Sequence, residues 1–561
     1  MKGSTTIDSL LLIPLDERPI NAAYPRLLTD ALGWGLASPT PLLGGRKTPA
    51  DVAGLADWLL AAASGAGASG GASGSPSGRP LGAVIALDTL AWGGLIPSRQ
   101  SGNDLGGALG RLEVLRRMRE AAPGLPILAF SSIQRVSRED DDAEEPSYYR
   151  SYGRAIFRRS VLEHRAVADA LSAEEARELA GLRAELPAEV WQDQLDIRQR
   201  TLAVNLAALD LVADGVIDTL VLNQDDTAEW GLNVMNRRRL EAEVRRRGLD
   251  DRVLVYPGAD EVAQALIARL ASRVIGRRPR VSAFYASRRG ADVQTAYEDR
   301  PLGDLVTVHL RAAGAVQLPP GAPVDLWLGV NSPSRSQGQG GASHAIGYAA
   351  EHPGALTEDE QAWLAAAEAP VDGLDRSLPA FRDTLRALLD GPALVALADV
   401  AHVNGADDLL MTGLATDGAL PLLAGYGGWN TAGNALGSAV TLGCLAALGA
   451  DRAALELAVA ARLVDDWLYQ ARVRTRLLLQ PELKPLGLGG FVPAARQGAV
   501  ADQARAGLDA ESLRFGLPYR VTHLAFPWQR VFEIDYAIER TDERGTERGA
   551  APGGQRAGGA A

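Results

Sequence analysis

Residues 218–230 read DTLVLNQDDTAEW, a short apolar run that breaks off at Asn223 into a cluster of polar side chains. A helix is expected to begin near Glu229. In α/β proteins a buried parallel strand that ends in a polar loop before a helix is the usual place for a ligand. The stretch therefore predicts a buried strand with a candidate site directly after it.

Two adjacent carboxylates, Asp225 and Asp226, stand in that loop. Like charges a few ångströms apart cannot both ionise cheaply, so one aspartate can stay protonated while the other is charged. An alternative is that Asp226 only caps the following helix, because Asp226-x-x-Glu229 has the spacing of a capping box. A cap would explain one aspartate but not the neighbouring Asn223 and Gln224, and we therefore favour a functional pair.

The same succession of apolar run, polar residues and helix recurs along the chain, which predicts a mainly parallel sheet. Besides residues 219–222, strands are expected at 10–15, 83–87, 126–130, 253–256, 281–285, 325–330, 394–398 and 422–424. A doubtful element at 34–39 is left out of this count.

With about nine strands, one more than a (β/α)8 barrel needs, we favour a TIM-barrel-like core in which one strand is miscounted or lies outside the barrel. Counted in this way, the strand before Asp225 is the fourth. The alternative is two facing doubly wound α/β halves that divide near residue 275.

Composition divides the chain into an α/β core at 8–450, a C-terminal helical and β appendage at 451–540 and a disordered tail at 541–561. Within the core, residues 64–80 are nearly all Gly, Ser, Ala and Pro, which predicts a flexible insertion. Residues 147–215 are expected to form a long helical insertion, and the acidic run at 139–145 a solvated loop.

The totals exclude several classes of protein. A net charge of −12 argues against a general nucleic-acid binder and against docking on anionic membranes. Cys444 is the only cysteine, which rules out an internal disulfide and a cysteine-cluster metal site. The early apolar run is too short for a signal peptide, and no stretch is long enough to span a bilayer. We therefore expect a cytoplasmic protein with neither nucleic-acid nor membrane partners; its oligomeric state is not predicted.

The residues that follow the expected strands are mainly carboxylates, amides, arginines and indoles. Carboxylates and amides bind hydroxyl groups through directional hydrogen bonds, and indoles offer a flat apolar face, so the mixture suits a sugar. The predicted substrate-binding residues are Asp16, Glu17, Arg18, Asp88, Trp92, Arg135, Asn223, Asp260, Glu261, Asn331, Ser332, Asn404, Trp429, Asn430 and Asn434.

A bound sugar suggests a glycoside hydrolase that uses two carboxylates. Adjacent Asp225 and Asp226 suit substrate assistance, in which Asp225 orients a 2-acetamido group and Asp226 is the general acid. The placement is similar to that in substrate-assisted N-acetylhexosaminidase barrels, by analogy of position and residue type. We expect a cofactor-free glycosidase acting on a small sugar, with N-acetylhexosaminides as the specific candidates.

Two alternatives stay open. Asp16, Asp88, Asp226, Glu261 and His402 could hold Mg²⁺ or Mn²⁺, which would give a metal-dependent hydrolase, isomerase or lyase acting on a polyhydroxylated molecule. The second alternative is a sugar-binding protein without catalysis. Nucleotide-binding and serine-hydrolase motifs are missing from the chain.

Several short motifs follow the expected strands: Pro14-Leu15-Asp16-Glu17-Arg18-Pro19, Leu87-Asp88-Thr89-Leu90 with Gly93-Gly94-Leu95, Asn223-Gln224-Asp225-Asp226, Pro257-Gly258-Ala259-Asp260-Glu261 and Gly428-Trp429-Asn430-Thr431. Together, over roughly residues 8–540, they resemble a bacterial family catalogued as domain of unknown function 4127. The resemblance implies one large family domain and carries no assured activity. The predicted carbohydrate chemistry therefore rests on the strand-end residues.

Overall fold

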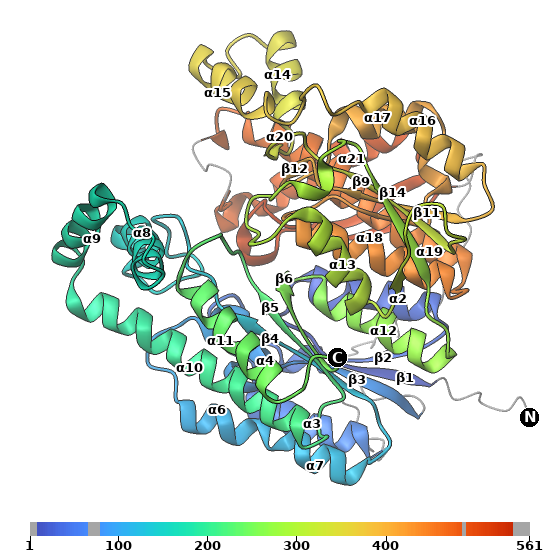
Figure 1. Ribbon diagram of the computed structural model, residues 1–561. Helices are drawn as coiled ribbons and strands as arrows, with labels where there is room; N and C mark the ends of the chain where they lie inside the picture. Colours follow the sequence, from blue (N-terminus) through green and yellow to red (C-terminus); the bar gives the residue numbers. More distant parts are fainter. Residues whose placement is uncertain (1–7, 65–78, 485–489, 542–561) are drawn as a thin grey trace, which may run out of the picture.

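The computed structural model describes residues 8–64, 79–484 and 490–541, which form a mixed α/β fold with two main parallel sheets (Figure 1). The first sheet has six strands in the order β2-β1-β3-β4-β5-β6. Its members are β1 (Ser9–Ile13), β2 (Gly35–Ala37), β3 (Pro80–Ala86), β4 (Ile127–Ile133), β5 (Thr219–Gln224) and β6 (Val253–Pro257).

The second sheet has five strands in the order β13-β11-β9-β7-β8. They are β7 (Arg280–Tyr285), β8 (Val316–Gln317), β9 (Leu326–Asn331), β11 (Leu394–Asp399) and β13 (Gly425–Gly427). Two small sheets complete the strands of the described residues: parallel β10 (Gly338–Gln339) with β12 (His402–Val403), and antiparallel β14 (Tyr519–Ala525) with β15 (Asp535–Arg540).

Both main sheets follow one rule of strand order. In each, the first strand pairs with the second on one side and with the third on the other, and later strands add beyond the third. This is the flavodoxin-like doubly wound order. The strand pairs of the described residues thus make two separate sheets and do not show the favoured single barrel. The pairing matches the alternative of two halves, since α12 (Val262–Ile275) joins the last strand of one sheet to the first of the other.

Two strand assignments need correction. The doubtful element at 34–39 contains β2, a short edge strand, so the strand before Asp225 is the fifth of its sheet and not the fourth. The strand expected at 422–424 is displaced, because a 3₁₀ turn (Leu420–Leu422) precedes β13. β13 contains two glycines in three residues, and glycine is depleted in strands, so propensity pointed to the apolar residues before it.

The first sheet is buried on both faces, as its continuous apolar strands predict. In β1, Leu10 and Leu12 belong to one core, while Leu11 and Ile13 belong to a second core on the opposite face. Helices α3 (Val52–Ala63), α7 (Val114–Ala121) and α10 (Ala188–Ala213) cover the second face, whereas α2 (Tyr24–Ala31) and α12 lie between the two sheets (Figure 1).

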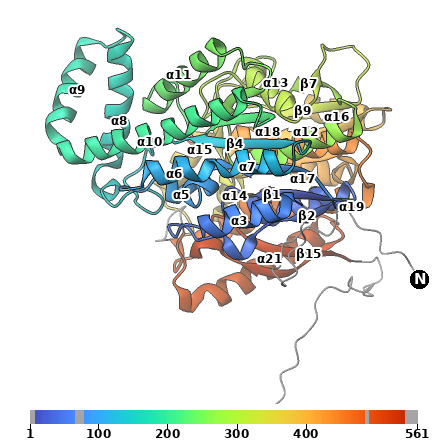
Figure 2. The same ribbon diagram turned by 90° about the horizontal axis from the view of Figure 1, so that it is seen from below.

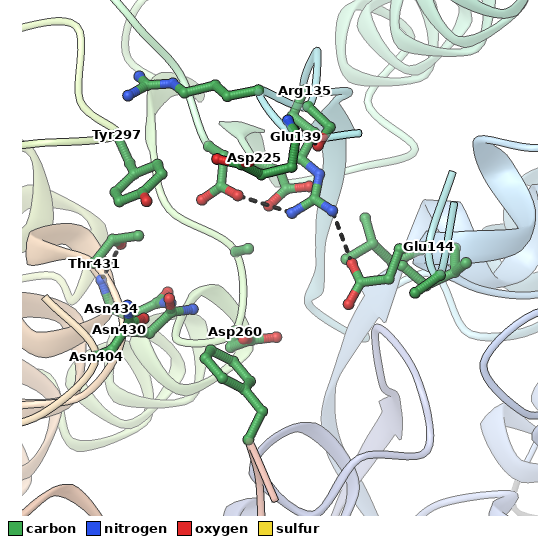
Figure 3. A pocket seen from close by; sticks show the side chains of 18 of the residues that line it. Arg135, Glu139, Glu144, Asp225, Asp260, Tyr297, Asn404, Asn430, Thr431 and Asn434 are labelled. Carbon is green, nitrogen blue, oxygen red and sulfur yellow. Dashed lines mark hydrogen bonds and ion pairs between the residues drawn. The ribbon is translucent and has the colours of Figure 1, made fainter. Parts of the chain in front are cut away.

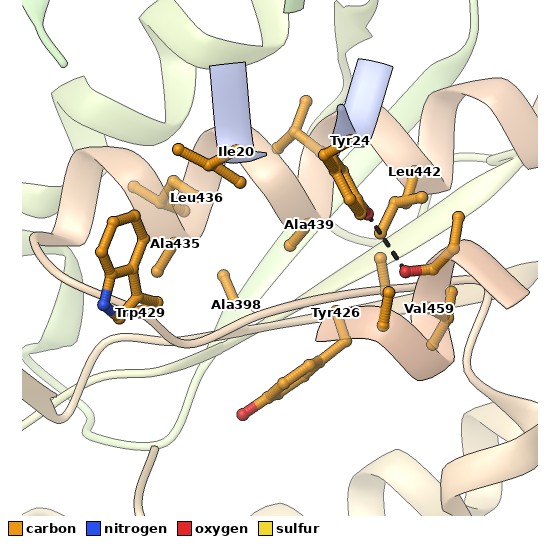
Figure 4. Packing of buried hydrophobic residues seen from close by; sticks show 14 of the residues in the cluster. Ile20, Tyr24, Ala398, Tyr426, Trp429, Ala435, Leu436, Ala439, Leu442 and Val459 are labelled. Atoms are coloured by element: carbon orange, nitrogen blue, oxygen red, sulfur yellow. Dashed lines mark hydrogen bonds between the residues drawn. The ribbon is translucent and has the colours of Figure 1, made fainter. Parts of the chain in front are cut away.

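The first core continues into the second half, so one packed interior joins the two sheets. Ile20 and Tyr24 lie against α18 (Ala432–Ala447), as Figure 4 shows. Helix α18 also approaches α12 closely, because a Cβ at Gly437 would lie 1.9 Å from Cγ of Glu261. The two halves therefore pack directly against each other through α12 and α18.

Residues 147–215 contain α8 (Tyr149–Val167), α9 (Ala173–Glu185) and α10, and Figure 2 shows α8 and α9 extending away from the sheets. The side chains of Ser172 and Glu175 form the capping box of α9. Most of the predicted flexible insertion and of the predicted tail lies outside the described residues. Within the described ranges, no helix is both long and apolar enough to cross a bilayer.

The C-terminal region consists of α19 (Arg452–Arg462), a π-helix (Leu463–Val473), α20 (Arg474–Leu478), α21 (Gln497–Arg514) and the β14–β15 hairpin. It does not stand apart from the halves, because Glu533 contacts Arg18 and Arg530 contacts Glu144. The remaining α-helices of the described residues are α1 (Pro19–Ala22), α4 (Leu87–Trp92), α5 (Leu95–Ser98), α6 (Leu105–Leu112), α11 (Leu232–Arg246), α13 (Leu302–Ala312), α14 (Ala342–Glu351), α15 (Glu358–Glu368), α16 (Leu378–Leu389) and α17 (Asp408–Thr416).

Candidate active site

A pocket of about 300 Å³ lies where the carboxyl ends of β4, β5 and β6 face loops of the second half (Figure 3). Both predicted catalytic residues line it, together with part of the predicted binding set. The predicted residues in its wall are Arg18, Arg135, Asp225, Asp226, Asp260, Asn404, Asn430 and Asn434. Residues more than 400 positions apart in the chain thus meet at one cavity, as expected for the ends of parallel strands.

Asp225 is tied to Arg99, whose buried side chain is only 3% exposed. The same guanidinium lies 3.1 Å from Oε2 of Glu144 and 3.3 Å from Oε1 of Glu145. Arg99 also donates to the Gln134 side chain. Asp225 is therefore a fixed carboxylate at the pocket wall.

Asp226 is more accessible, with 29% of its side chain exposed, and its Oδ2 accepts a hydrogen bond of 2.8 Å from Arg135. Burial and the neighbouring charge of Asp225 raise its pKa, and the guanidinium groups of Arg135 and Arg99 oppose this only in part. The backbone of Asp226 is left-handed, with φ of 35°. The two aspartates thus differ in their surroundings: Asp225 is ion-paired in the wall, whereas Asp226 is the more accessible and has a raised pKa.

The capping alternative for Asp226 is not supported. Helix α11 begins at Leu232, three residues beyond the expected start near Glu229, and Gly231 occupies its N-cap position without a side-chain cap. The left-handed residue Asp226 and the irregular segment 227–231 separate β5 from the helix. Asp226 is left in the pocket wall.

The acidic run at 139–145 is only partly solvated, which corrects the expectation of a loop facing water. Glu145 is buried, and Glu144 lies 3.0 Å from Arg135 and 2.6 Å from Arg530. Burial alone would raise the pKa of Glu144, but the Arg135 and Arg530 guanidinium groups hold it well below its usual range. These glutamates are buried by ion pairs that include arginines distant in sequence. Local charge patterning does not reveal such pairs.

Arg18 is held by carboxylates on two sides, 2.8 Å from Asp16 and 2.5 Å from Asp260. Asn21 donates to both of these aspartates. Burial raises the pKa of Asp260 to about 6, against the lowering effect of Arg18. Asp16 does not line the pocket, so its role is to position Arg18 at the pocket edge.

The second half contributes a wall of amides. Asn404 and Asn430 have left-handed backbones, with φ of 60° and 65°, and Asn404 N donates to Asn430 O at 2.9 Å. Thr431 caps α18 by accepting from the backbone N–H of Asn434 at 3.4 Å. Amides both donate and accept, so this wall can pair with hydroxyl groups.

Besides Asp16, five predicted binding residues of the first half lie outside the pocket wall. Asp88 accepts from Ser132 N at 2.8 Å, and Asn223 donates to Gly258 O at 3.0 Å. Glu17 accepts from the Trp528 indole, and Glu261 accepts from Ala259 N at 3.0 Å. The fifth, Trp92, belongs to the hydrophobic core. Their side chains support the loops around the pocket, which residue type alone does not distinguish from ligand binding.

In the second half, Asn331, Ser332 and Trp429 also lie outside the pocket wall. Asn331 donates to Asp399 at 2.7 Å, and Ser332 Oγ accepts from Ser287 N at 3.1 Å. The Trp429 ring lies tilted against that of Phe532, with 5.8 Å between the ring centroids, and it lines a second cavity of about 250 Å³.

The residues proposed for the metal alternative are not brought together. Asp16 binds Arg18, Asp88 binds Ser132, and His402 lies 2.7 Å from Glu368 in the second half. Within residues 8–64, 79–484 and 490–541, no three His, Cys, Asp or Glu side chains are arranged to hold a metal ion.

Several pocket residues were missed from the sequence because they follow no predicted strand. The main ones are Arg138, Tyr297, Glu298, Phe491, Arg530 and Phe532. Tyr297 has φ of 66°, and its carbonyl accepts from Thr227 N at 2.9 Å, next to the aspartate pair. Arg138 stacks on the Tyr297 ring at 4.9 Å. Only the Tyr-Glu-Asp run at 297–299 offered a sequence signal, and a weak one.

The fold and the pocket define a parallel two-sheet α/β protein with a carboxylate-bearing cavity between its halves. The chain belongs to the family described as "Protein of unknown function (DUF4127)", whose sequence model matches residues 10–537. This match confirms the resemblance inferred from the strand-end motifs. Comparison with curated proteins and with solved structures gave no match.

Proposed function

We propose that this protein is a glycoside hydrolase acting on a small sugar, and specifically a substrate-assisted N-acetylhexosaminidase. The observation that supports this proposal most is the difference in surroundings between Asp225 and Asp226. Asp225 is fixed by Arg99, whereas Asp226 is accessible in the pocket and has a raised pKa. A general acid needs a pKa near the working pH, and its partner must stay charged.

The proposed reaction assigns one task to each aspartate. Protonated Asp226 donates its proton to the glycosidic oxygen as the bond to the anomeric carbon breaks. The acetamido carbonyl oxygen of the substrate attacks that carbon, and Asp225 stabilises the positive charge that develops on the acetamido nitrogen. Water then attacks the anomeric carbon of the oxazolinium ion, the bond to the acetamido oxygen breaks to restore the neutral amide, and Asp226, now a carboxylate, takes up a proton of the water.

The rest of the wall supplies binding groups. Asn404, Asn430 and Asn434 provide amides on the second half, and Arg135 keeps Asp226 oriented. Such a mixture pairs with the hydroxyl edges of a neutral sugar.

The test is a panel of 4-nitrophenyl α- and β-glycosides that includes the N-acetylglucosaminides and N-acetylgalactosaminides. We expect an N-acetylhexosaminide to be cleaved and Asp226→Asn to lower kcat by about 10²–10⁴-fold. Replacing the acetamido group by trifluoroacetamido weakens the nucleophile and should slow the wild-type enzyme further. EDTA should leave the rate unchanged.

Three results would contradict the proposal. Full turnover by Asp226→Asn would remove the assigned acid. Loss of activity in EDTA would favour the metal-dependent alternative. Binding of a sugar that no assay shows to be cleaved would leave a binding protein.

A further inference from the structure

Three side-chain oxygens at the pocket have no hydrogen-bond partner among the described residues. They are Oε1 of Gln224, Oε2 of Glu298 and Oδ1 of Asn434. All three residues line the pocket, and they are 1%, 2% and 5% exposed. Buried polar atoms are nearly always paired, so a group of three at one cavity calls for a partner from outside the chain.

Glu298 is held firmly in this group. Its Oε1 accepts a hydrogen bond of 2.8 Å from Gly433 N in the first turn of α18. The preceding residue, Tyr297, is bonded through its carbonyl to Thr227 N at 2.9 Å. Glu298 is thus anchored to the second half on one side and to the loop of the aspartate pair on the other.

The position also depends on Gly433. A Cβ at this residue would lie 3.0 Å from Pro257 O and 3.2 Å from Oε1 of Glu298. An alanine here would press on the glutamate and on the end of β6, and Gly433 therefore provides a variant that moves Glu298 without removing it.

The surroundings of Glu298 favour its neutral form. Burial raises its pKa well above the usual range, Asp299 and Glu261 add to this, and the Gly433 N–H and Arg300 oppose it. Asp299 itself is paired with Arg237 and Arg300. A protonated carboxyl is a hydrogen-bond donor, so Oε2 differs in kind from the two amide oxygens, which only accept.

We propose that Gln224, Glu298 and Asn434 form a subsite for free, uncharged hydroxyl groups of the substrate, with Glu298 donating to a hydroxyl oxygen. This inference rests on the proposed function, because it places the sugar in the same pocket. A hydroxyl group can accept a hydrogen bond, as Glu298 requires, and can also donate one, as the amide oxygens require. A carboxylate in its place would meet two acceptors, so the subsite selects neutral sugars over uronic acids.

The test compares two substitutions at one position. Glu298→Gln keeps a donor and should stay within about threefold of wild type in its affinity for N-acetyl-D-glucosamine, measured by calorimetry. Glu298→Leu removes the donor and should weaken that affinity about 10-fold or more, as expected for a lost buried hydrogen bond. Wild type should bind deoxy analogues of the sugar more weakly than the sugar itself. The analogue that lacks the hydroxyl contacted by Glu298 should bind to wild type and to Glu298→Leu with equal affinity.

Thermal melting checks that the variants fold. If Glu298→Leu does not fold, Gly433→Ala is used in its place and should weaken the binding of the same sugar. Carbon-13 NMR of δ-labelled glutamate gives a second readout: the signal that disappears in Glu298→Gln should be that of a protonated carboxyl at neutral pH.

Failure of the subsite can be told from failure of the proposed reaction. Unchanged sugar affinity in Glu298→Leu, or wild-type preference for D-glucuronic acid over the neutral sugar, overturns the subsite even if glycosides are cleaved. Weakened sugar binding in Glu298→Leu with no cleaved glycoside supports the subsite and overturns the reaction.

Discussion

The two halves share a strand order but differ in the chemistry at their strand ends. After the fifth strand of each half comes a left-handed residue, Asp226 after β5 and Asn430 after β13, and then a helix. In the first half the loop presents two carboxylates, and in the second it presents amides. The same scaffold thus carries different groups in its two halves: the first contributes the carboxylates proposed to react, and the second contributes most of the amides in the wall.

In each half, a buried arginine lies in the chain between the third and the fourth strand of the main sheet. Arg99 binds Asp225, and Arg376 lies 2.5 Å from Asp407, with side chains 3% and 1% exposed. Arg99 serves the pocket, whereas Asp407 lies outside the pocket wall. This pair offers the sharpest test of the difference between the halves.

The largest effect is expected for Arg99→Met and Arg376→Met. Each removes the arginine partner of a buried carboxylate, which typically costs about 3–5 kcal/mol of unfolding free energy. Only Arg99→Met should also lower kcat per folded molecule, by roughly 100-fold, because it releases a catalytic carboxylate. Urea unfolding and turnover of the cleaved glycoside measure both effects. Equal loss of turnover in the two variants would contradict the assignment of the reactive groups to the first half.

The next effect concerns pH. Burial, and then the charge of Asp407, raise the pKa of Asp399 to about 7. The folded state therefore binds a proton that the unfolded state has released, so this contribution to stability is full below about pH 4 and is lost as pH rises through about 7. Asp399→Asn should remove this dependence.

Stability of the wild type relative to Asp399→Asn should fall by about 1.4 kcal/mol per pH unit inside that window. Urea unfolding at several pH values between 4 and 8 checks the slope. In the first half, burial raises the pKa of Asp88 to about 6. The pH range over which wild type loses stability relative to Asp88→Asn should therefore end at a lower pH. Parallel stability curves for wild type and Asp399→Asn would contradict the assignment.

A smaller effect is expected for Asn430→Gly. Glycine accepts the left-handed backbone, so the fold should persist while one amide is lost from the wall. A single hydrogen bond corresponds to about 1 kcal/mol, and kcat/KM should fall roughly fivefold with kcat nearly unchanged. A fall in kcat as large as that of Asp226→Asn would place reactive chemistry in the second half as well.

The smallest effects are expected at two matching capping boxes. Ser172 with Glu175 caps α9, which follows the first half's fourth strand, and Thr357 with Glu360 caps α15 in the second half. Ser172→Ala and Thr357→Ala should each cost about 1 kcal/mol and leave turnover unchanged. Hydrogen exchange of the two helices would detect the local loosening.

Much of the fold could be predicted because each buried strand is an apolar run that ends in polar residues. The parallel sheets and the aspartate pair follow from that local pattern. Which strands pair across the chain does not, and the two-sheet arrangement therefore remained an alternative. β2 was doubtful and β13 was displaced, since both are short and contain glycine.

The site could be predicted only in part. The aspartate pair and three of the five predicted asparagines reach the pocket, whereas Asp88 and Asn331 bind neighbouring loops instead. A polar residue after a strand can face a ligand or brace the adjacent loop, and its type is the same in both cases. Glu298 was missed because it stands far from any strand end.

The bond between Arg18 and Glu533 joins residues 515 positions apart, and Arg530 reaches back to Glu144. The edge of the cavity is thus completed by a segment that follows both main sheets in the chain. Both sheets can therefore form while the cavity still lacks this part of its wall, and the cavity is complete only when the segment around Arg530 packs against the first half.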